Sequence, residues 1–168
     1  KNTQRQVCAA MYPENARLLN SMLARVNADV VLDIIALGQL DAIFTLKERL
    51  DAGAMVALLA DRAVRQDGHQ NIAFLGDPAP FPLGPFRLAA LLRRPVFFMT
   101  GLYQGGRRYD IHFERLADFS SVAPAQRSEA IRQAMERYAT LLAQHCRLAP
   151  YNWFNFYDFW EGDPRVSP

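Results

Sequence analysis

The sequence is poor in cysteine and has no long hydrophobic run. Its two cysteines, Cys8 and Cys146, stand far apart and form no C-x-x-C pair, so we expect two buried or free thiols in a reducing compartment. The longest apolar runs, such as Val96–Gly101, have the length of a strand, whereas a membrane-spanning helix needs about 18 apolar residues. The sequence therefore argues against a disulfide-stabilised secreted domain and predicts no membrane-spanning helix.

Charge of one sign is also scarce. The chain has 19 Lys and Arg against 17 Asp and Glu, a formal net charge of +2, which is too small an excess to indicate a nucleic-acid partner. Hydrophobic residues make up 51% of the sequence and charged residues 21%, which is enough apolar surface for a core and excludes a disordered chain. At 168 residues, we expect one α/β domain spanning 1–168.

Common catalytic and cofactor motifs are missing. The sequence contains no G-x-S-x-G nucleophile motif and no phosphate-loop or dinucleotide fingerprint, and its Gly-Gly pair at 105–106 indicates a hairpin instead. The three histidines, His69, His112 and His145, lack the spacing typical of metal ligands. We therefore predict no metal site and no bound cofactor, and favour a structural or solvated role for each histidine.

Hydrophobic periodicity predicts helices that alternate with strands. The predicted elements are a helix over 14–25, a strand over 30–35, a helix over 40–50, strands over 55–60 and 72–75, a helix over 82–92, a strand over 96–102 with a hairpin into 108–113, and a helix over 125–146. This order predicts an α/β fold with a mainly parallel central sheet, helices on both faces and an antiparallel hairpin.

A charged pair, Asp61-Arg62, directly follows the wholly apolar strand predicted over 55–60. In open α/β sheets, ligand crevices form at the carboxyl ends of strands. A carboxylate beside a guanidinium suits the binding of substrate oxygens or a phosphate. The alternative is a solvated loop start or a helix-capping ion pair.

The segment over 74–92 is rich in proline and leads into a predicted helix, with Phe81 and Gly84 near its entry. A glycine there permits close approach of a ligand, and the free N–H groups of a helix N-terminus attract anions. The alternative is a rigid connection with Phe81 in the core.

The tail over 151–160 carries seven aromatic residues in ten positions. Trp and Tyr favour amphipathic boundaries, so the tail is a candidate lipid-facing or interface surface. The alternative is a C-terminal strap that packs on the sheet, and both interpretations hold if the strap also lines an acyl pocket.

Taken together, three segments resemble the bacterial lipid A biosynthesis acyltransferases (lauroyl and myristoyl transferases), within the lysophospholipid and glycerol-phosphate acyltransferase superfamily. They read MVALLADR, FLGDPAPFPLGPFRLAALLRRPVFFM and APYNWFNFYDFW. Asp61 and Arg62 resemble the acidic and arginine positions of the superfamily, 81–84 resembles its Phe-x-x-Gly motif, and 95–99 resembles the strand that follows. The resemblance extends from about Tyr12 to Trp160 and implies an acyltransferase-like fold.

The resemblance implies transfer of a fatty acyl group from a thioester donor, acyl carrier protein or acyl-CoA, to a hydroxyl of a lipid or glycolipid acceptor. It implies substrate binding by Asp61, Arg62, Phe81 and Gly84, and a cytoplasmic protein held peripherally on the inner membrane.

In the family, a His-x4-Asp/Glu motif supplies the general base for attack on the thioester. In this sequence the residues five positions after the three histidines are Phe74, Ala117 and Pro150, so no catalytic residue is visible. We expect that the chain is the C-terminal part of a longer protein whose motif lies upstream of Lys1, or that the motif has been lost. The alternative function is then a non-catalytic lipid- or acyl-carrier-binding module.

Overall fold

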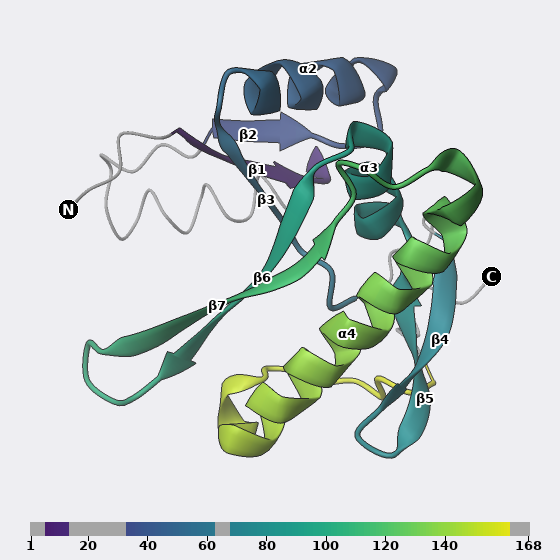
Figure 1. The fold of residues 1–168 in the computed structure, drawn as a ribbon. Helices are drawn as coiled ribbons and strands as arrows, with labels where there is room; N and C mark the ends of the chain where they lie inside the picture. The colour runs from purple at the N-terminus through teal and green to yellow at the C-terminus, as the bar shows by residue number, and fades with distance from the viewer. Residues whose placement is uncertain (1–5, 14–32, 63–67, 162–168) are drawn as a thin grey trace. The chain divides into compact units, whose positions relative to one another are not determined.

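Figure 1 presents the fold as a computed structural model, which describes residues 6–13, 33–62 and 68–161. The helix predicted over 14–25 and the start of the strand predicted over 30–35 lie outside these residues. The chain divides into two compact units, Lys1–Leu59 and Ala60–Pro168. These are unit 1 and unit 2, in chain order.

Unit 1 contains a three-stranded parallel sheet. Its strands β1 (Val7–Met11), β2 (Asp33–Ala36) and β3 (Met55–Leu58) lie in the order β2-β1-β3, and both pairings are parallel. The helix α2 (Leu40–Asp51) connects β2 to β3 and contacts both strands. The predictions of a helix over 40–50 and of a parallel strand beginning at Met55 are confirmed.

Small and apolar side chains form the core of unit 1. Cys8, Ala10 and Ile35 share one face of the sheet by register, and they are buried together with Ala42 and Leu46 of α2. Small residues at these positions let a helix approach the sheet closely. On the opposite face, residues such as Val7 remain half-exposed.

The described residues of unit 2 form two antiparallel hairpins and two α-helices. Its elements are β4 (His69–Phe74), β5 (Asp77–Pro82), α3 (Gly84–Leu92), β6 (Pro95–Tyr103), β7 (Tyr109–Asp118), the 3₁₀ turn η1 (Pro124–Gln126), α4 (Arg127–Leu148) and the 3₁₀ turn η2 (Pro150–Asn152). The long helix α4 contacts both hairpins and α3, as can be followed in Figure 1. The predicted helices over 82–92 and 125–146 and the strand over 96–102 are confirmed with small shifts at their ends.

The strand β5 was not predicted, since its residues were assigned to a proline-rich loop that leads into the helix over 82–92. It pairs with β4 through a two-residue turn, where Leu75 and Gly76 both have positive φ, as such hairpin turns require. Its prolines occupy every second position, 78, 80 and 82. Because alternate residues of a strand direct their N–H groups to the same side, all three missing donors face the unpaired edge of the hairpin.

The predicted α/β class is confirmed, but the prediction of one central, mainly parallel sheet is not. Among the described strands, parallel pairing is confined to unit 1, and strands from His69 onward form two separate two-stranded antiparallel sheets. The reason is local, because connections as short as Leu75-Gly76 and 104–108 can join only antiparallel neighbours. The single domain over 1–168 stays a prediction.

The core of unit 2 is dominated by aromatic rings. Residues that are almost inaccessible to solvent come from β4, β5, α3, β6, α4 and the segments that follow β7 and η2, and they include Phe74, Phe81, Phe86, Phe98, Phe119, Met135 and Phe159. Within the described ranges, none of the helices is both long enough and apolar enough to cross a lipid bilayer.

Candidate functional site

Asp61 and Arg62 stand at the start of unit 2, three and four residues after the end of β3. Their side chains form an ion pair, with Arg62 Nε 3.3 Å from Asp61 Oδ2, and they are 25% and 49% exposed. The guanidinium of Arg62 also donates a hydrogen bond to the carbonyl oxygen of Phe154, at 3.1 Å. The pair is therefore open to solvent, and Arg62 in addition holds the aromatic tail.

Tyr138 is partly buried and packs against the aromatic core, near enough to Asp61 to be affected by its charge. Its ring meets those of Phe81, Phe86 and Phe98 at centroid distances of 6.0, 5.7 and 5.5 Å, each edge to face. Burial raises the pKa of the Tyr138 hydroxyl far above its usual range, and the negative charge of nearby Asp61 raises it further. The hydroxyl therefore stays protonated and is available as a hydrogen-bond donor.

Sequence reasoning missed the importance of Tyr138. The residue stands on the apolar stripe of the helix predicted over 125–146 and counts there as a packing residue. The available signal was its polar tip, because a buried tyrosine hydroxyl needs a polar neighbour. Asp61, whose charge affects Tyr138, comes from a segment 77 residues earlier in the chain, which periodicity cannot reveal.

Phe81 lies in the core, as the alternative interpretation of the 74–92 segment, a rigid connection, predicted. It is inaccessible to solvent, and its ring packs against Phe74 and Phe159 at 5.4 and 5.7 Å as well as against Tyr138. Gly84 is half-buried and is the first residue of α3, three positions after Phe81. Phe81 packs on Tyr138, whose pKa the charge of Asp61 affects, and the junction of β5 and α3 connects Phe81 to Gly84. Substrate binding by these residues stays a prediction.

The aromatic tail is a strap with two faces. Trp153, Tyr157 and Phe159 turn toward the core of unit 2, and the indole N–H of Trp160 donates to the carbonyl oxygen of Phe74 at 3.3 Å. The outward side chains are almost fully or largely exposed, namely Tyr151 (92%), Phe154 (66%) and Phe156 (90%). The predicted packing strap is confirmed, and the same segment leaves an exposed aromatic surface.

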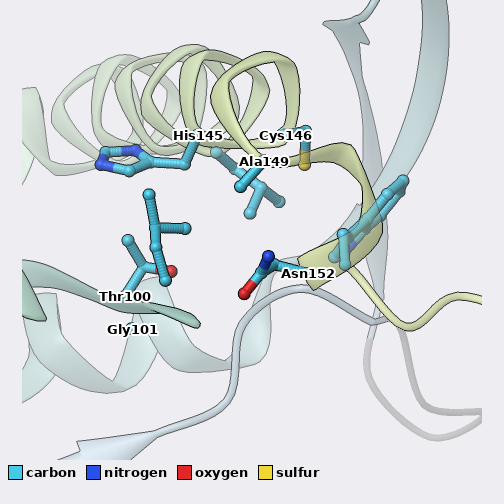
Figure 2. Close-up of a pocket in the computed structure, with 9 residues that line it drawn as sticks. Thr100, Gly101, His145, Cys146, Ala149 and Asn152 are labelled. Atoms are coloured by element: carbon cyan, nitrogen blue, oxygen red, sulfur yellow. The ribbon is translucent and has the colours of Figure 1, made fainter. Parts of the chain in front are cut away.

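A small pocket lies between the end of α4, β6 and η2 (Figure 2). Its lining residues are Thr100, Gly101, Leu102, Leu142, His145, Cys146, Ala149, Asn152 and Trp153. Its volume of about 40 Å³ has room for a few water molecules and not for an acyl chain. It contains none of the predicted site residues.

His145 in this pocket is a packing residue. Its Nδ1 lies 2.8 Å from the carbonyl oxygen of Leu141, one turn earlier in α4, and its ring packs on Phe98 and His112 at centroid distances of 5.4 and 5.1 Å. Within the described parts of the chain, no histidine forms an ion pair with a carboxylate, and no three His, Cys, Asp or Glu side chains are grouped to hold a metal.

Both cysteines are free and buried, as predicted. Burial raises the pKa of the Cys146 thiol. Burial also raises the pKa of Cys8, and a hydrogen bond from its Sγ to Asp33 Oδ2, at 3.3 Å, raises it further. Neither thiol has the lowered pKa of a reactive cysteine, so neither is a candidate nucleophile.

Comparison with known proteins supports the resemblance. A search of curated proteins finds no match. The family model of the bacterial lipid A biosynthesis acyltransferases matches residues 2–161, which is nearly the whole chain and includes the Asp61-Arg62 pair, the 81–84 segment and the aromatic strap. The chain therefore belongs to the bacterial lipid A biosynthesis acyltransferase family.

Proposed function

We propose that this protein transfers a fatty acyl group from a thioester donor, acyl carrier protein or acyl-CoA, to a hydroxyl of a lipid or glycolipid acceptor. The family match over residues 2–161 carries the proposal, since it supports acyl transfer in general. In the reaction, the hydroxyl oxygen attacks the thioester carbonyl, the C–S bond breaks, and the hydroxyl proton leaves with the thiol by way of a base.

Asp61 and Arg62 are the proposed acceptor-binding residues. Both side chains are solvent-accessible and lie together as an ion pair. The carboxylate can accept hydrogen bonds from acceptor hydroxyls, and the guanidinium can bind a phosphate. Burial and the charge of Asp61 both raise the pKa of Tyr138, so Tyr138 stays neutral and adds no charge near the pair.

Phe81 and Gly84 are proposed to shape the groove for the acyl chain or its carrier. Phe81 fixes the aromatic layer from within the core, and Gly84 begins α3 with no side chain of its own. A residue without a Cβ allows a thioester arm to approach the backbone closely.

The general base is not assigned to a residue of this sequence. None of the three histidines has the His-x4-Asp/Glu spacing of the family, and none forms an ion pair with a carboxylate among the described residues. This observation favours a second candidate, a non-catalytic module that binds lipid or acyl carrier through the same surface.

We further propose that the protein works at the cytoplasmic face of the bacterial inner membrane as a peripheral protein, without a nucleic-acid partner. A lipid acceptor with two or more acyl chains stays in the bilayer, so the hydroxyl must be met at the membrane surface.

The test is a transfer assay with the product of the complete gene. Purified protein is incubated with acyl carrier protein or CoA thioesters of several chain lengths and with a panel of lipid and glycolipid acceptors, and the lipids are analysed by mass spectrometry. We expect an acylated lipid with at least one donor and acceptor pair. Lipid or carrier binding without any acyl transfer would support the module instead.

A variant pair connects the assay to the site. Arg62→Ala removes the proposed anion-binding guanidinium, and we expect at least a tenfold lower transfer rate. Arg132→Ala removes a similar guanidinium that pairs with Glu129 and Glu136 on the exposed face of α4, and we expect the wild-type rate. Equal rates for the two variants would remove Arg62 from the proposed site.

A further inference from the structure

The β6–β7 hairpin exposes an apolar face that none of the described residues of unit 2 covers. Alternate residues of the two strands share this face by register, with Met99 opposite Phe113, Gly101 opposite Ile111, and Tyr103 opposite Tyr109. The exposed side chains are Phe97 (58%), Met99 (60%), Tyr103 (46%), Tyr109 (60%), Ile111 (54%) and Phe113 (65%). The other face supplies core residues, such as Phe98.

The area of this face is large for an unoccupied surface. Six side chains that each offer about 200 Å², and that are roughly half exposed, amount to about 600 Å² of mostly apolar surface. The largest apolar patch on a typical monomer covers about 300–600 Å² and is often functional, so this face stands at the upper end of that range. Ile111 fills the gap at Gly101, where a Cβ would lie 3.1 Å from Ile111 Cδ1, so the face is continuous.

The charges at the tip of the face are of one sign, whereas at its other end Arg115, opposite Phe97, forms an ion pair with Asp118. The loop at the tip of the hairpin, farthest from α3 in Figure 1, carries the exposed pair Arg107 and Arg108. Neither arginine forms an ion pair among the described residues. The acidic residues Asp110 and Glu114 alternate with the apolar residues of β7 and therefore belong to the opposite face.

Polarity also changes in a regular way along the hairpin. The purely apolar pair Met99 and Phe113 lies in the middle of the hairpin, and the pair Tyr103 and Tyr109 lies nearer its tip. The two arginines occupy the loop at the tip. Tyrosine prefers the boundary between hydrocarbon and headgroups, and arginine is attracted to anionic headgroups. A protein partner would require no such order, whereas a bilayer surface has it.

We propose that the exposed face of the β6–β7 hairpin docks on an anionic lipid bilayer. Its apolar side chains enter the acyl boundary, Tyr103 and Tyr109 lie at the headgroup level, and Arg107 and Arg108 contact lipid phosphates. This surface rests on the proposed membrane association, for which it supplies the contact, and it does not depend on acyl transfer.

The test measures partition of the purified protein onto sedimented vesicles of phosphatidylcholine, with and without 30% phosphatidylglycerol. Each arginine near an anionic surface strengthens binding about fivefold, so we expect Arg107→Gln/Arg108→Gln to bind the anionic vesicles about 25-fold more weakly and the neutral vesicles nearly unchanged. Arg132→Gln, on the exposed face of α4, is the matched control and should bind like the wild type.

A second pair of variants tests the apolar contact. Met99→Thr/Phe113→Thr keeps residues that favour strands, and we expect at least tenfold weaker binding to both vesicle types. Phe44→Ala, at an equally exposed position (73%) on α2, should bind like the wild type. Circular dichroism verifies that each variant is folded. If the threonine variant does not fold, Tyr109→Trp should show a blue-shifted emission with vesicles and quenching by brominated lipid.

The outcomes separate the two claims. If the wild type binds vesicles and the hairpin variants bind equally well, or Tyr109→Trp is not quenched, the hairpin is not the docking surface and the membrane association stands. If the wild type does not bind vesicles, both the docking surface and the membrane association are contradicted. The proposal of acyl transfer, tested with a detergent-solubilised acceptor, is unaffected by that result. A wild-type dimer that dissociates in the threonine variant would assign the face to a second copy of the chain.

Discussion

Replacing Phe159 by alanine removes the ring that joins the aromatic strap to the core of unit 2. The side chain is 2% exposed, and its ring lies 4.9 Å from Trp153, 5.5 Å from Phe74 and 5.7 Å from Phe81 between centroids. A buried Phe→Ala change lowers the free energy of unfolding by about 3–5 kcal/mol. Since a whole domain is stable by only about 5–15 kcal/mol, the expected loss is a large share of the total.

The loss is measurable as a shift in Tm. For a chain of this size, 1 kcal/mol changes Tm by about 2–4 °C, so we expect Phe159→Ala to melt about 6–20 °C lower. The control is Phe156→Ala in the same strap. Phe156 is 90% exposed, and we expect its replacement to change the free energy of unfolding by less than about 0.5 kcal/mol.

The chain carries its own probe for this experiment. Its two tryptophans, Trp153 and Trp160, both lie in the strap, so intrinsic fluorescence reports the strap while far-UV circular dichroism reports the helices. If the strap is part of the core, both signals of the wild type change together on heating, and both shift in Phe159→Ala. Equal Tm values for Phe159→Ala and Phe156→Ala would refute the docked strap.

Three further predictions concern the site and the thiols. Arg62→Ala, which removes the hydrogen bond to the strap, should lower the free energy of unfolding by about 1 kcal/mol in urea titrations, whereas an unchanged midpoint would show that this contact is not stabilising. Because the native pKa of Tyr138 lies above its unfolded value of about 10, the stability that it contributes is complete below pH 10 and is lost as the pH rises further. Tyr138→Phe should therefore lose less stability than the wild type in alkaline unfolding experiments, and Asp61→Asn should lower the pKa of Tyr138 in an absorbance titration. Cys8 and Cys146 should react with a thiol reagent at pH 8 only after denaturant is added, and rapid reaction of either one without denaturant would show that it is accessible.

Much of the secondary structure could be predicted because local periodicity determines it. The apolar stripe of α4 and the strand-length run at β6 each have a single consistent pattern, and the structure has both where they were expected. The Gly-Gly pair at 105–106 also predicted the hairpin between β6 and β7, since both glycines adopt positive φ there.

The sheet arrangement could not be predicted, because pairing depends on contacts between distant segments. The prolines of β5 argued against a strand in the sequence, since proline interrupts the hydrogen bonding of most strands and is tolerated only at a free edge. The strand β1 (Val7–Met11) was missed because its sequence, VCAAM, is too short and has too few β-branched residues to be distinguished from a loop.

The pairing of two candidate site residues could be anticipated from the sequence, whereas their role in substrate binding stays a prediction. Asp61 and Arg62 were selected because a charged pair followed an apolar strand, and the structure has them accessible and paired. The neighbouring Tyr138 and the hydrogen bond from Arg62 to the strap bring together residues 77 and 92 positions apart. Nothing in a single sequence encodes such contacts locally.

The most direct measurement follows two products of one reaction, the free thiol released from the donor and the ester formed on the acceptor. With the complete gene product, a suitable acyl thioester and a hydroxylated lipid, we expect one new ester for each thiol released, and no thiol when the acceptor hydroxyl is absent. Thiol release without ester formation would indicate a hydrolase. Release of neither product with any donor and acceptor, by a folded protein, would contradict acyl transfer.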